Sequence, residues 1–232
     1  MEQVGLGAGR RIDAIQLPYH TGFPNIWEYA EAMKRGDVDF SVFVVGKCPL
    51  CGQRGCLREI TPYSRGVMEL FSWRTGDVLV ARFLCRSSAK TVSLLPLELI
   101  PYCRYTLQSI VMTLLFFHAV WGTPGRTLED IWDDLPPDSS VTVYLVRYWL
   151  CLVLRGFRRG HAELSQRYDL ETIRTKIGLA GDLTELHGYF DAFGIRGPPE
   201  GCYAVAQLAA SYSEATGRFL VGRSSQDRRS QG

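Results

Sequence analysis

The chain has 232 residues, of which 46% are hydrophobic and 22% are charged, and its formal net charge is +2. This composition supports a buried core and excludes a chain that is disordered throughout. The net charge is too small to indicate a nucleic-acid partner by itself. The opening MEQVGLGAGRRIDA has no apolar core segment, so we expect no secretory signal. Seven cysteines, an odd number, then favour a reducing, cytoplasmic location over a disulfide framework.

Residues 1–39 are expected to form an N-terminal segment that is irregular at first and then helical. Prolines and glycines interrupt the first 24 residues. Asn25 is a residue that caps helices, and apolar residues follow it at helical spacing. These features predict a helix over residues 26–35 that ends at Gly36.

A small β module is predicted over residues 40–96. Its strands are expected at residues 40–45, 57–65, 67–73, 78–85 and 90–95. The sequence Arg-Thr-Gly-Asp at 74–77 predicts a hairpin turn between two of them. Such a hairpin would bring Cys85 back toward the cysteines that precede the second strand.

Four cysteines form the most informative motif, with Cys48, Cys51 and Cys56 in KCPLCGQRGC and Cys85 in ARFLCRSSAKT. Two cysteines three positions apart around a tight turn are typical of a structural zinc knuckle. Zinc ribbons usually carry a second Cys-x-x-Cys, but here Ser88 stands three positions after Cys85. We therefore expect Cys56 to be the fourth ligand, which would close a four-thiolate site around a structural Zn²⁺.

Two other interpretations of the cysteines remain open. One is a degenerate ribbon that has lost its metal and is held together by its hydrophobic pairs. The other is redox catalysis, which the local sequence disfavours. A reactive Cys-x-x-Cys usually begins a helix after a strand, whereas the Gly-Gln-Arg-Gly at 52–55 indicates a loop.

After residue 96 the hydrophobic pattern becomes helical, which predicts an α-helical region over residues 97–221 and a disordered polar tail over 222–232. Helices are expected at residues 102–121, 128–135, 141–166, 170–177, 182–193 and 203–216. The apolar runs 107–120 and 141–154 are shorter than a membrane span and each contains a basic or histidine side chain. We therefore expect buried helices and no membrane partner.

A short helix starting near residue 127, a Pro-Pro-Asp-Ser-Ser turn and a long helix have the outline of a helix-turn-helix. One side of the long helix is apolar. The other side carries the candidate DNA contacts Tyr144, Arg147, Arg155, Arg158 and Arg159. A plain bundle helix and a protein–protein surface remain open, because a helix C-terminus favours arginine whether or not DNA is present.

The motifs of the β module resemble the zinc-ribbon front end of bacterial insertion-sequence transposases, and more closely a group of short transposase-related proteins. The similarity spans roughly residues 40–120 and rests on Cys-Pro-Leu-Cys-Gly, on Tyr63 and Arg65, on Arg82-Phe-Leu-Cys85-Arg86 and on Thr91-Val-Ser-Leu-Leu-Pro96. The resemblance implies that Cys48, Cys51 and Cys85 are metal ligands. It also implies that helix-turn-helix helices follow and that the protein binds DNA.

We therefore expect an α+β fold in which a small zinc-ribbon-like β-hairpin module precedes an α-helical helix-turn-helix region. The expected function is DNA binding related to a mobile genetic element, with a transposase or a second copy of the chain as further partners and no small-molecule substrate. We expect no catalysis, because the acidic cluster at 129–134 lies on one short helix and favours a solvated face over a nuclease metal site. The alternatives are a protein-interaction module with a structural zinc site and the remnant of a transposase enzyme.

Overall fold

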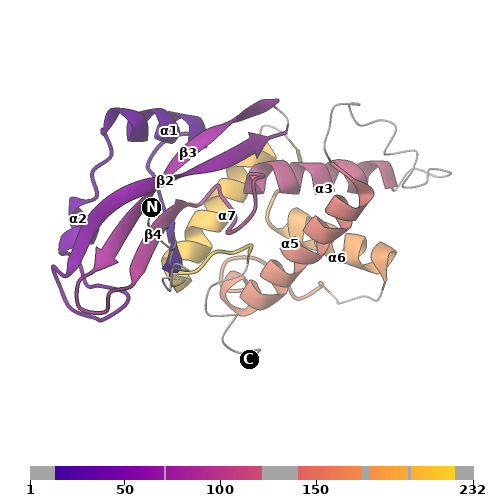
Figure 1. Ribbon diagram of the computed structural model, residues 1–232. Helices are drawn as coiled ribbons and strands as arrows, with labels where there is room; N and C mark the ends of the chain where they lie inside the picture. The colour runs from indigo at the N-terminus through magenta and orange to yellow at the C-terminus, as the bar shows by residue number, and fades with distance from the viewer. Residues whose placement is uncertain (1–13, 71, 122–140, 174–177, 198–199, 223–232) are drawn as a thin grey trace, which may run out of the picture.

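The computed structural model describes residues 14–70, 72–121, 141–173, 178–197 and 200–222. Within these residues a four-stranded mixed sheet with two N-terminal helices is followed by a region of four helices (Figure 1). The α+β class is therefore confirmed. The predicted short helix at 128–135 and almost all of the predicted tail lie outside the described residues.

The sheet has the strand order β1-β4-β3-β2. Its strands are β1 (Ala14–Tyr19), β2 (Leu57–Glu69), β3 (Arg74–Cys85) and β4 (Thr91–Pro96). β2, β3 and β4 pair antiparallel in succession, and β1 pairs parallel with β4. The predicted strand at 57–65 and the start of the one at 67–73 form one long strand, β2, whose register shifts between Ile60 and Tyr63. The turn predicted at 74–77 was wrong, because these residues begin β3 and pair with the end of β2.

Two N-terminal predictions were wrong. β1 lies in the segment that was expected to be irregular. Its Pro18 has no backbone N–H, and this is tolerated because β1 is an edge strand with a neighbour on one side only. Residues 40–45 were expected to be a strand but contain the short helix α2 (Ser41–Val45). The Asp39 carboxylate accepts hydrogen bonds from the Ser41 N–H and hydroxyl, at 2.8 and 2.9 Å, and this local polar contact favours a helical turn.

The remaining helices are α1 (Ile26–Arg35), α3 (Leu107–Trp121), α5 (Val143–Leu164), α6 (Leu179–Ala192) and α7 (Glu200–Thr216). α1 has the predicted bounds, because the Asn25 side chain accepts the Trp27 and Glu28 N–H groups and Gly36 adopts a left-handed conformation. No described helix is long and apolar enough to cross a membrane.

α3 begins five residues later than predicted because the segment before it forms backbone hydrogen bonds with the end of β2. The Met68 N–H donates to the Arg104 carbonyl, and the Thr106 N–H donates to the Met68 carbonyl. The Thr106 hydroxyl then accepts the Ser109 N–H at 3.1 Å and so caps the helix. Residues 104–106 thus link the end of β2 to the start of the helical region.

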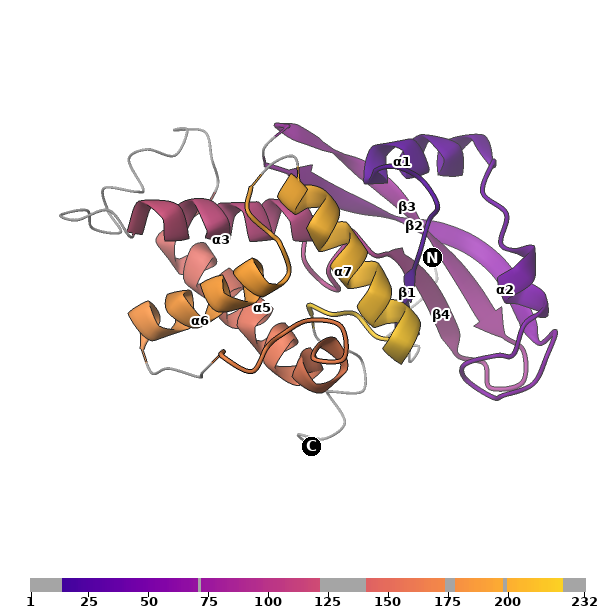
Figure 2. The same ribbon diagram turned by 180° about the vertical axis from the view of Figure 1, so that it is seen from behind.

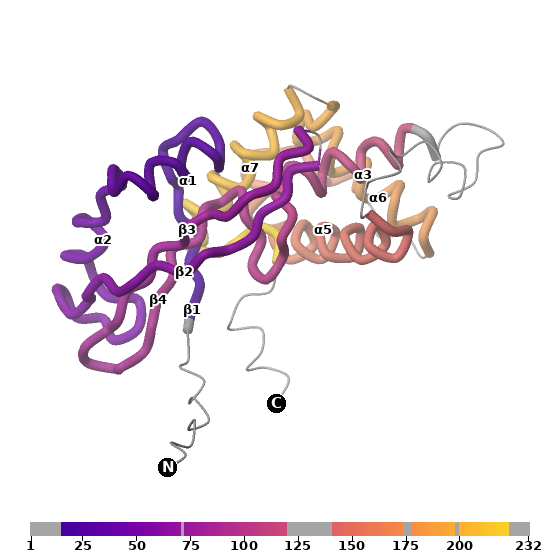
Figure 3. Tube along the Cα trace, turned by 45° about the horizontal axis from the view of Figure 1, so that its top comes forward, coloured from indigo at the N-terminus to yellow at the C-terminus, as the bar shows by residue number. Residues whose placement is uncertain are grey.

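The apolar core has a helical part and a sheet part. Seen from behind, α1 lies over the sheet and α7 runs between the sheet and the other helices (Figure 2). Trp149 of α5 is fully buried in the helical part, and Phe83 of β3 is fully buried in the sheet part. The tube view places α2 at one end of the molecule and the α3, α5 and α6 group at the other (Figure 3).

Candidate functional site

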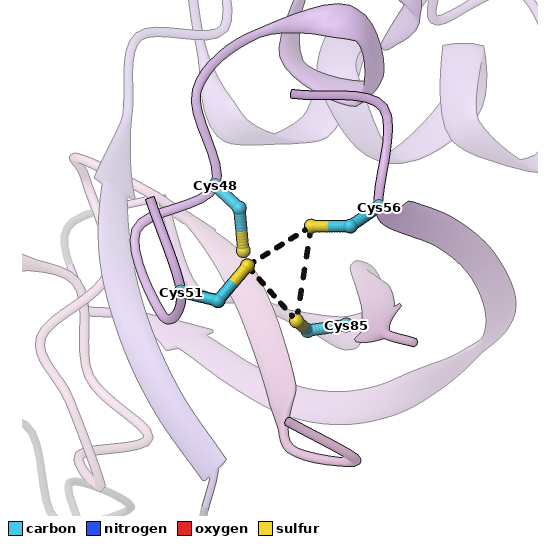
Figure 4. Close-up of side chains that lie close together, drawn as sticks. All are labelled: Cys48, Cys51, Cys56 and Cys85. Atoms are coloured by element: carbon cyan, nitrogen blue, oxygen red, sulfur yellow. Dashed lines mark hydrogen bonds between the residues drawn. The ribbon is translucent and has the colours of Figure 1, made fainter. Parts of the chain in front are cut away.

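The four predicted cysteines converge at one end of the sheet (Figure 4). Their Sγ atoms all lie within 4.8 Å of one another, with 3.3 Å from Cys51 to Cys56, 3.6 Å from Cys51 to Cys85 and 3.8 Å from Cys56 to Cys85. Sulfurs bound tetrahedrally to zinc at about 2.3 Å would be about 3.8 Å apart, whereas a disulfide needs about 2.05 Å. The cysteines therefore form a candidate metal site that includes Cys56, and four thiolates favour zinc.

A tight loop positions Cys48 and Cys51. The Gly52 N–H donates to the Cys48 carbonyl, and the Cys48 N–H donates to the Gln53 carbonyl, both at 2.8 Å. Gly52 has φ +77°, a left-handed conformation that costs glycine little. The Leu50 N–H then points at the Cys48 Sγ, at 3.4 Å. Backbone N–H groups that point at cysteine sulfurs are typical of metal knuckles.

The β2–β3 pair delivers the other two sulfurs. Cys56 directly precedes β2, and Cys85 is the last residue of β3, opposite Leu57. The Arg86 N–H donates to the Cys56 carbonyl at 2.9 Å, which ties the two ends together. Strand pairing therefore brings together two cysteines that are far apart in the sequence, as the predicted hairpin required.

Ser88 acts on the site although it offers no sulfur. Its buried hydroxyl has no hydrogen-bond partner of standard geometry among the described residues. It nevertheless lies close enough to the Cys85 sulfur to be the main cause that lowers the pKa of that thiol to about 6. At neutral pH such a thiol is mostly thiolate, the form that binds a metal ion. Burial, followed by the hydrogen bonds to the neighbouring thiols, raises the pKa of Cys56.

The exposed side of α5 carries part of the predicted DNA-binding set. Tyr144 is 81% exposed, and Arg147 and Arg155 are also exposed. The opposite side of the helix, with Val146 and Trp149, is buried in the helical core. Neither arginine forms an ion pair with another described residue. We call Tyr144, Arg147 and Arg155 the α5 face.

Arg158 and Arg159, the other two residues predicted to bind DNA, make contacts within the protein. The Arg158 guanidinium donates to both carboxylate oxygens of Glu185, at 2.8 and 2.7 Å, and to Asp182 at 3.1 Å. The Glu185 carboxylate raises the pKa of Arg158. Arg159 donates to the carbonyls of the segment after α7, at 3.2 to 3.3 Å. Asp182 and Glu185 are three positions apart in the predicted helix 182–193 and therefore lie on one side of it. This spacing was the feature of the sequence that could have indicated an acidic partner for Arg158.

One contact between α3 and α6 was not indicated by the sequence. The His118 ring stacks on the His187 ring, with centroids 3.8 Å apart, and His187 Nδ1 lies 3.1 Å from Asp191. Burial, and then His187, lowers the pKa of His118. No spacing rule links residues on two helices separated by a long stretch of chain, so only the packing reveals this pair.

Comparison with known proteins adds no relative. No protein-family model matches the chain, no curated protein matches it and no solved structure matches it. The resemblance to transposase-related proteins therefore stays a prediction from its motifs.

Proposed function

We propose that the protein is a cytoplasmic DNA-binding protein that contacts duplex DNA through the α5 face. The observation that carries this proposal is the pair of exposed arginines that lack an acidic partner within the described residues, beside an exposed tyrosine. Arginine and tyrosine side chains are common donors to DNA phosphates. Because the apolar side of α5 is buried, these donors are held on a rigid helix.

The spacing of the α5 face suits a groove. Arg147 and Arg155 are eight positions apart, which corresponds to about 12 Å along a helix. The major groove of B-DNA is about 12 Å wide and admits an α-helix. With α5 in the groove, the two guanidinium groups could contact phosphates at two positions along it, while Tyr144 donates from the turn before Arg147. In this proposal α5 is the second helix of a helix-turn-helix, and the predicted helix at 128–135 is the first.

In the same proposal, Cys48, Cys51, Cys56 and Cys85 hold a structural Zn²⁺ in a zinc-ribbon-like module. Four thiolates leave no open coordination position, so the ion would supply folding energy and no catalysis. The loop that carries the first cysteines has few buried apolar side chains besides the cysteines themselves, and the metal would hold it to β3. A role in a mobile genetic element, with a transposase or a second copy of the chain as partner, is supported only by the order of the motifs.

The test is the salt dependence of binding to a labelled DNA duplex, measured by fluorescence anisotropy. Removing two phosphate contacts with Arg147→Gln/Arg155→Gln should weaken binding and lower the slope of log K against log salt by about two. Arg196→Gln/Arg218→Gln removes the same charge from two other exposed arginines and should leave the slope nearly unchanged. Equal slopes for the two double variants would contradict the α5 face as the DNA contact.

A protein-interaction module is the second candidate. Tyr144 and Tyr148 of α5 are 81% and 51% exposed, and tyrosine is enriched in the centres of protein interfaces. An interface of this kind predicts binding to a protein partner that changes little with salt. If the wild-type chain shows no salt-dependent affinity for DNA, this second function is favoured.

A further inference from the structure

A hollow of about 430 Å³ lies on the sheet, away from the cysteine cluster. It is lined by Gln16, Tyr63, Arg65, Arg82, Ser93 and Tyr102. These residues come from all four strands and from the segment that joins β4 to α3. None of them is acidic and none is aliphatic. Two arginines and two tyrosines at one hollow indicate a ligand that is both anionic and aromatic.

Two lining side chains have hydrogen-bonding capacity that the described residues do not use. Arg82 is half-buried, its Cζ lies 6.0 Å from the centre of the Tyr63 ring, and it forms no ion pair with another described residue. Gln16 donates through Nε2 to the Tyr63 hydroxyl at 3.3 Å, but its Oε1 is buried with no partner among these residues. The hollow thus offers a cation and an acceptor.

The aromatic side of the hollow is held in an unusual conformation. Tyr102 is 61% exposed and has φ +62°, a left-handed conformation that is uncommon for tyrosine. Such a conformation persists only where its surroundings impose it. Arg65 donates to the carbonyls of Ile100 and Cys103, on both sides of Tyr102, and so fixes the turn that presents the ring.

We propose that this hollow binds a nucleotide of single-stranded DNA, with the base stacked on Tyr102 and the phosphate paired with Arg82. Nucleobase edges carry donors, which Gln16 Oε1 could accept. In a duplex the base faces are stacked on one another, so only an unpaired nucleotide could enter. This inference rests on the proposed function for DNA as the partner, but it involves a different surface from the α5 face.

The test compares two labelled probes with the full chain, an oligo(dT) of about eight nucleotides and a duplex. Stacking of a base on an aromatic side chain is sequence-tolerant, so oligo(dT) is a suitable probe. Tyr102→Ala should weaken oligo(dT) binding roughly tenfold, and Arg82→Gln should also weaken it. Tyr102→Phe keeps the ring and should bind like the wild type. Tyr203→Ala removes another exposed tyrosine, from α7, and should have no effect.

The outcomes separate this inference from the proposed function. Loss of oligo(dT) binding in Tyr102→Ala, with duplex binding retained, supports the hollow as a single-strand site. Duplex binding by the wild type without oligo(dT) binding overturns the hollow and leaves the α5 proposal standing. Oligo(dT) binding that disappears in Arg147→Gln/Arg155→Gln but survives in Tyr102→Ala also overturns it. If neither probe binds, both proposals fail.

Discussion

At the scale of single residues, the cysteine cluster takes its fourth sulfur from Cys56 and not from position 88. A second Cys-x-x-Cys would place its last thiol at residue 88, where the chain has serine. The buried Ser88 hydroxyl lies beside the Cys85 sulfur, and Cys56 supplies the fourth sulfur from the start of β2. Position 88 therefore lies next to one sulfur of the cluster, so a cysteine there could replace Cys56 as the fourth ligand.

Exchanging these two residues provides a test of the site. If the wild type binds zinc as proposed, Cys56→Ser should lose it, because three thiolates leave the tetrahedron incomplete. Cys56→Ser/Ser88→Cys should regain it, since position 88 already faces Cys85. Metal analysis of the purified variants measures both outcomes. Cys151→Ser, at an exposed position on α5, is the matched control and should keep the metal. Zinc retained in Cys56→Ser would contradict a four-cysteine site.

At the scale of elements, a bidentate ion pair between Arg158 and Glu185, which we call the clamp, joins α5 to α6. Glu185 is buried, with 3% of its surface exposed, and both of its carboxylate oxygens accept hydrogen bonds from Arg158. Arg158 itself is 39% exposed, so solvent partly screens the pair. The contact is structural. Mutation of Arg158 is therefore expected to lower the free energy of unfolding, whereas mutation of Arg155 on the same helix is not.

Removing the arginine from this clamp should destabilise the protein. Arg158→Met leaves the Glu185 carboxylate buried without its partner and should lower the free energy of unfolding by about 3 kcal/mol. Arg158→Met/Glu185→Leu removes both charges and should recover most of the loss. Urea denaturation measures both. Arg155→Met, at an exposed position, should stay within about 0.5 kcal/mol of the wild type. Equal stabilities for Arg155→Met and Arg158→Met would contradict the clamp.

At the scale of the whole molecule, the cysteine cluster and the α5 face belong to different parts of the core. The cysteines pack with Phe40, Phe83 and the ends of β3 and β4, whereas α5 packs with α3, α6 and α7. In the ribbon and tube views, α2 and the sheet lie toward one end of the molecule and α5 lies toward the other (Figures 1 and 3). Metal binding at one end is therefore expected to have a local effect.

Removal of the metal with a chelator should loosen the sheet end and spare the helices. Amide hydrogen exchange should become faster at residues 47–57 and 85–90, because the metal no longer holds the loop to β3. The amides of α5 should keep their protection, and the duplex binding proposed for the α5 face should change little. Loss of protection throughout α3 and α5 after chelation would show that the metal holds the whole fold, against this expectation.

Where local forces decide the structure, the sequence alone predicted it. The Asn25 cap and Gly36 set both ends of α1 through contacts within one turn. The hydrophobic periodicity of α5 predicted its buried and exposed sides. The cysteine spacing and the expected hairpin predicted which four sulfurs would meet, although β2 and β3 join between Glu69 and Arg74 and not through the predicted turn at 74–77.

Only the tertiary structure decided the features that depend on distant segments. β1 forms because residues 14–19 pair with β4, far along the chain, despite a proline that weakens the local signal. Arg155 and Arg158 look alike in sequence, but only Arg158 meets the acidic side chains of α6. The hollow on the sheet unites four strands and the turn at Tyr102. No single stretch of sequence predicts these contacts, because each contact depends on the side chains of two segments that only the fold brings together.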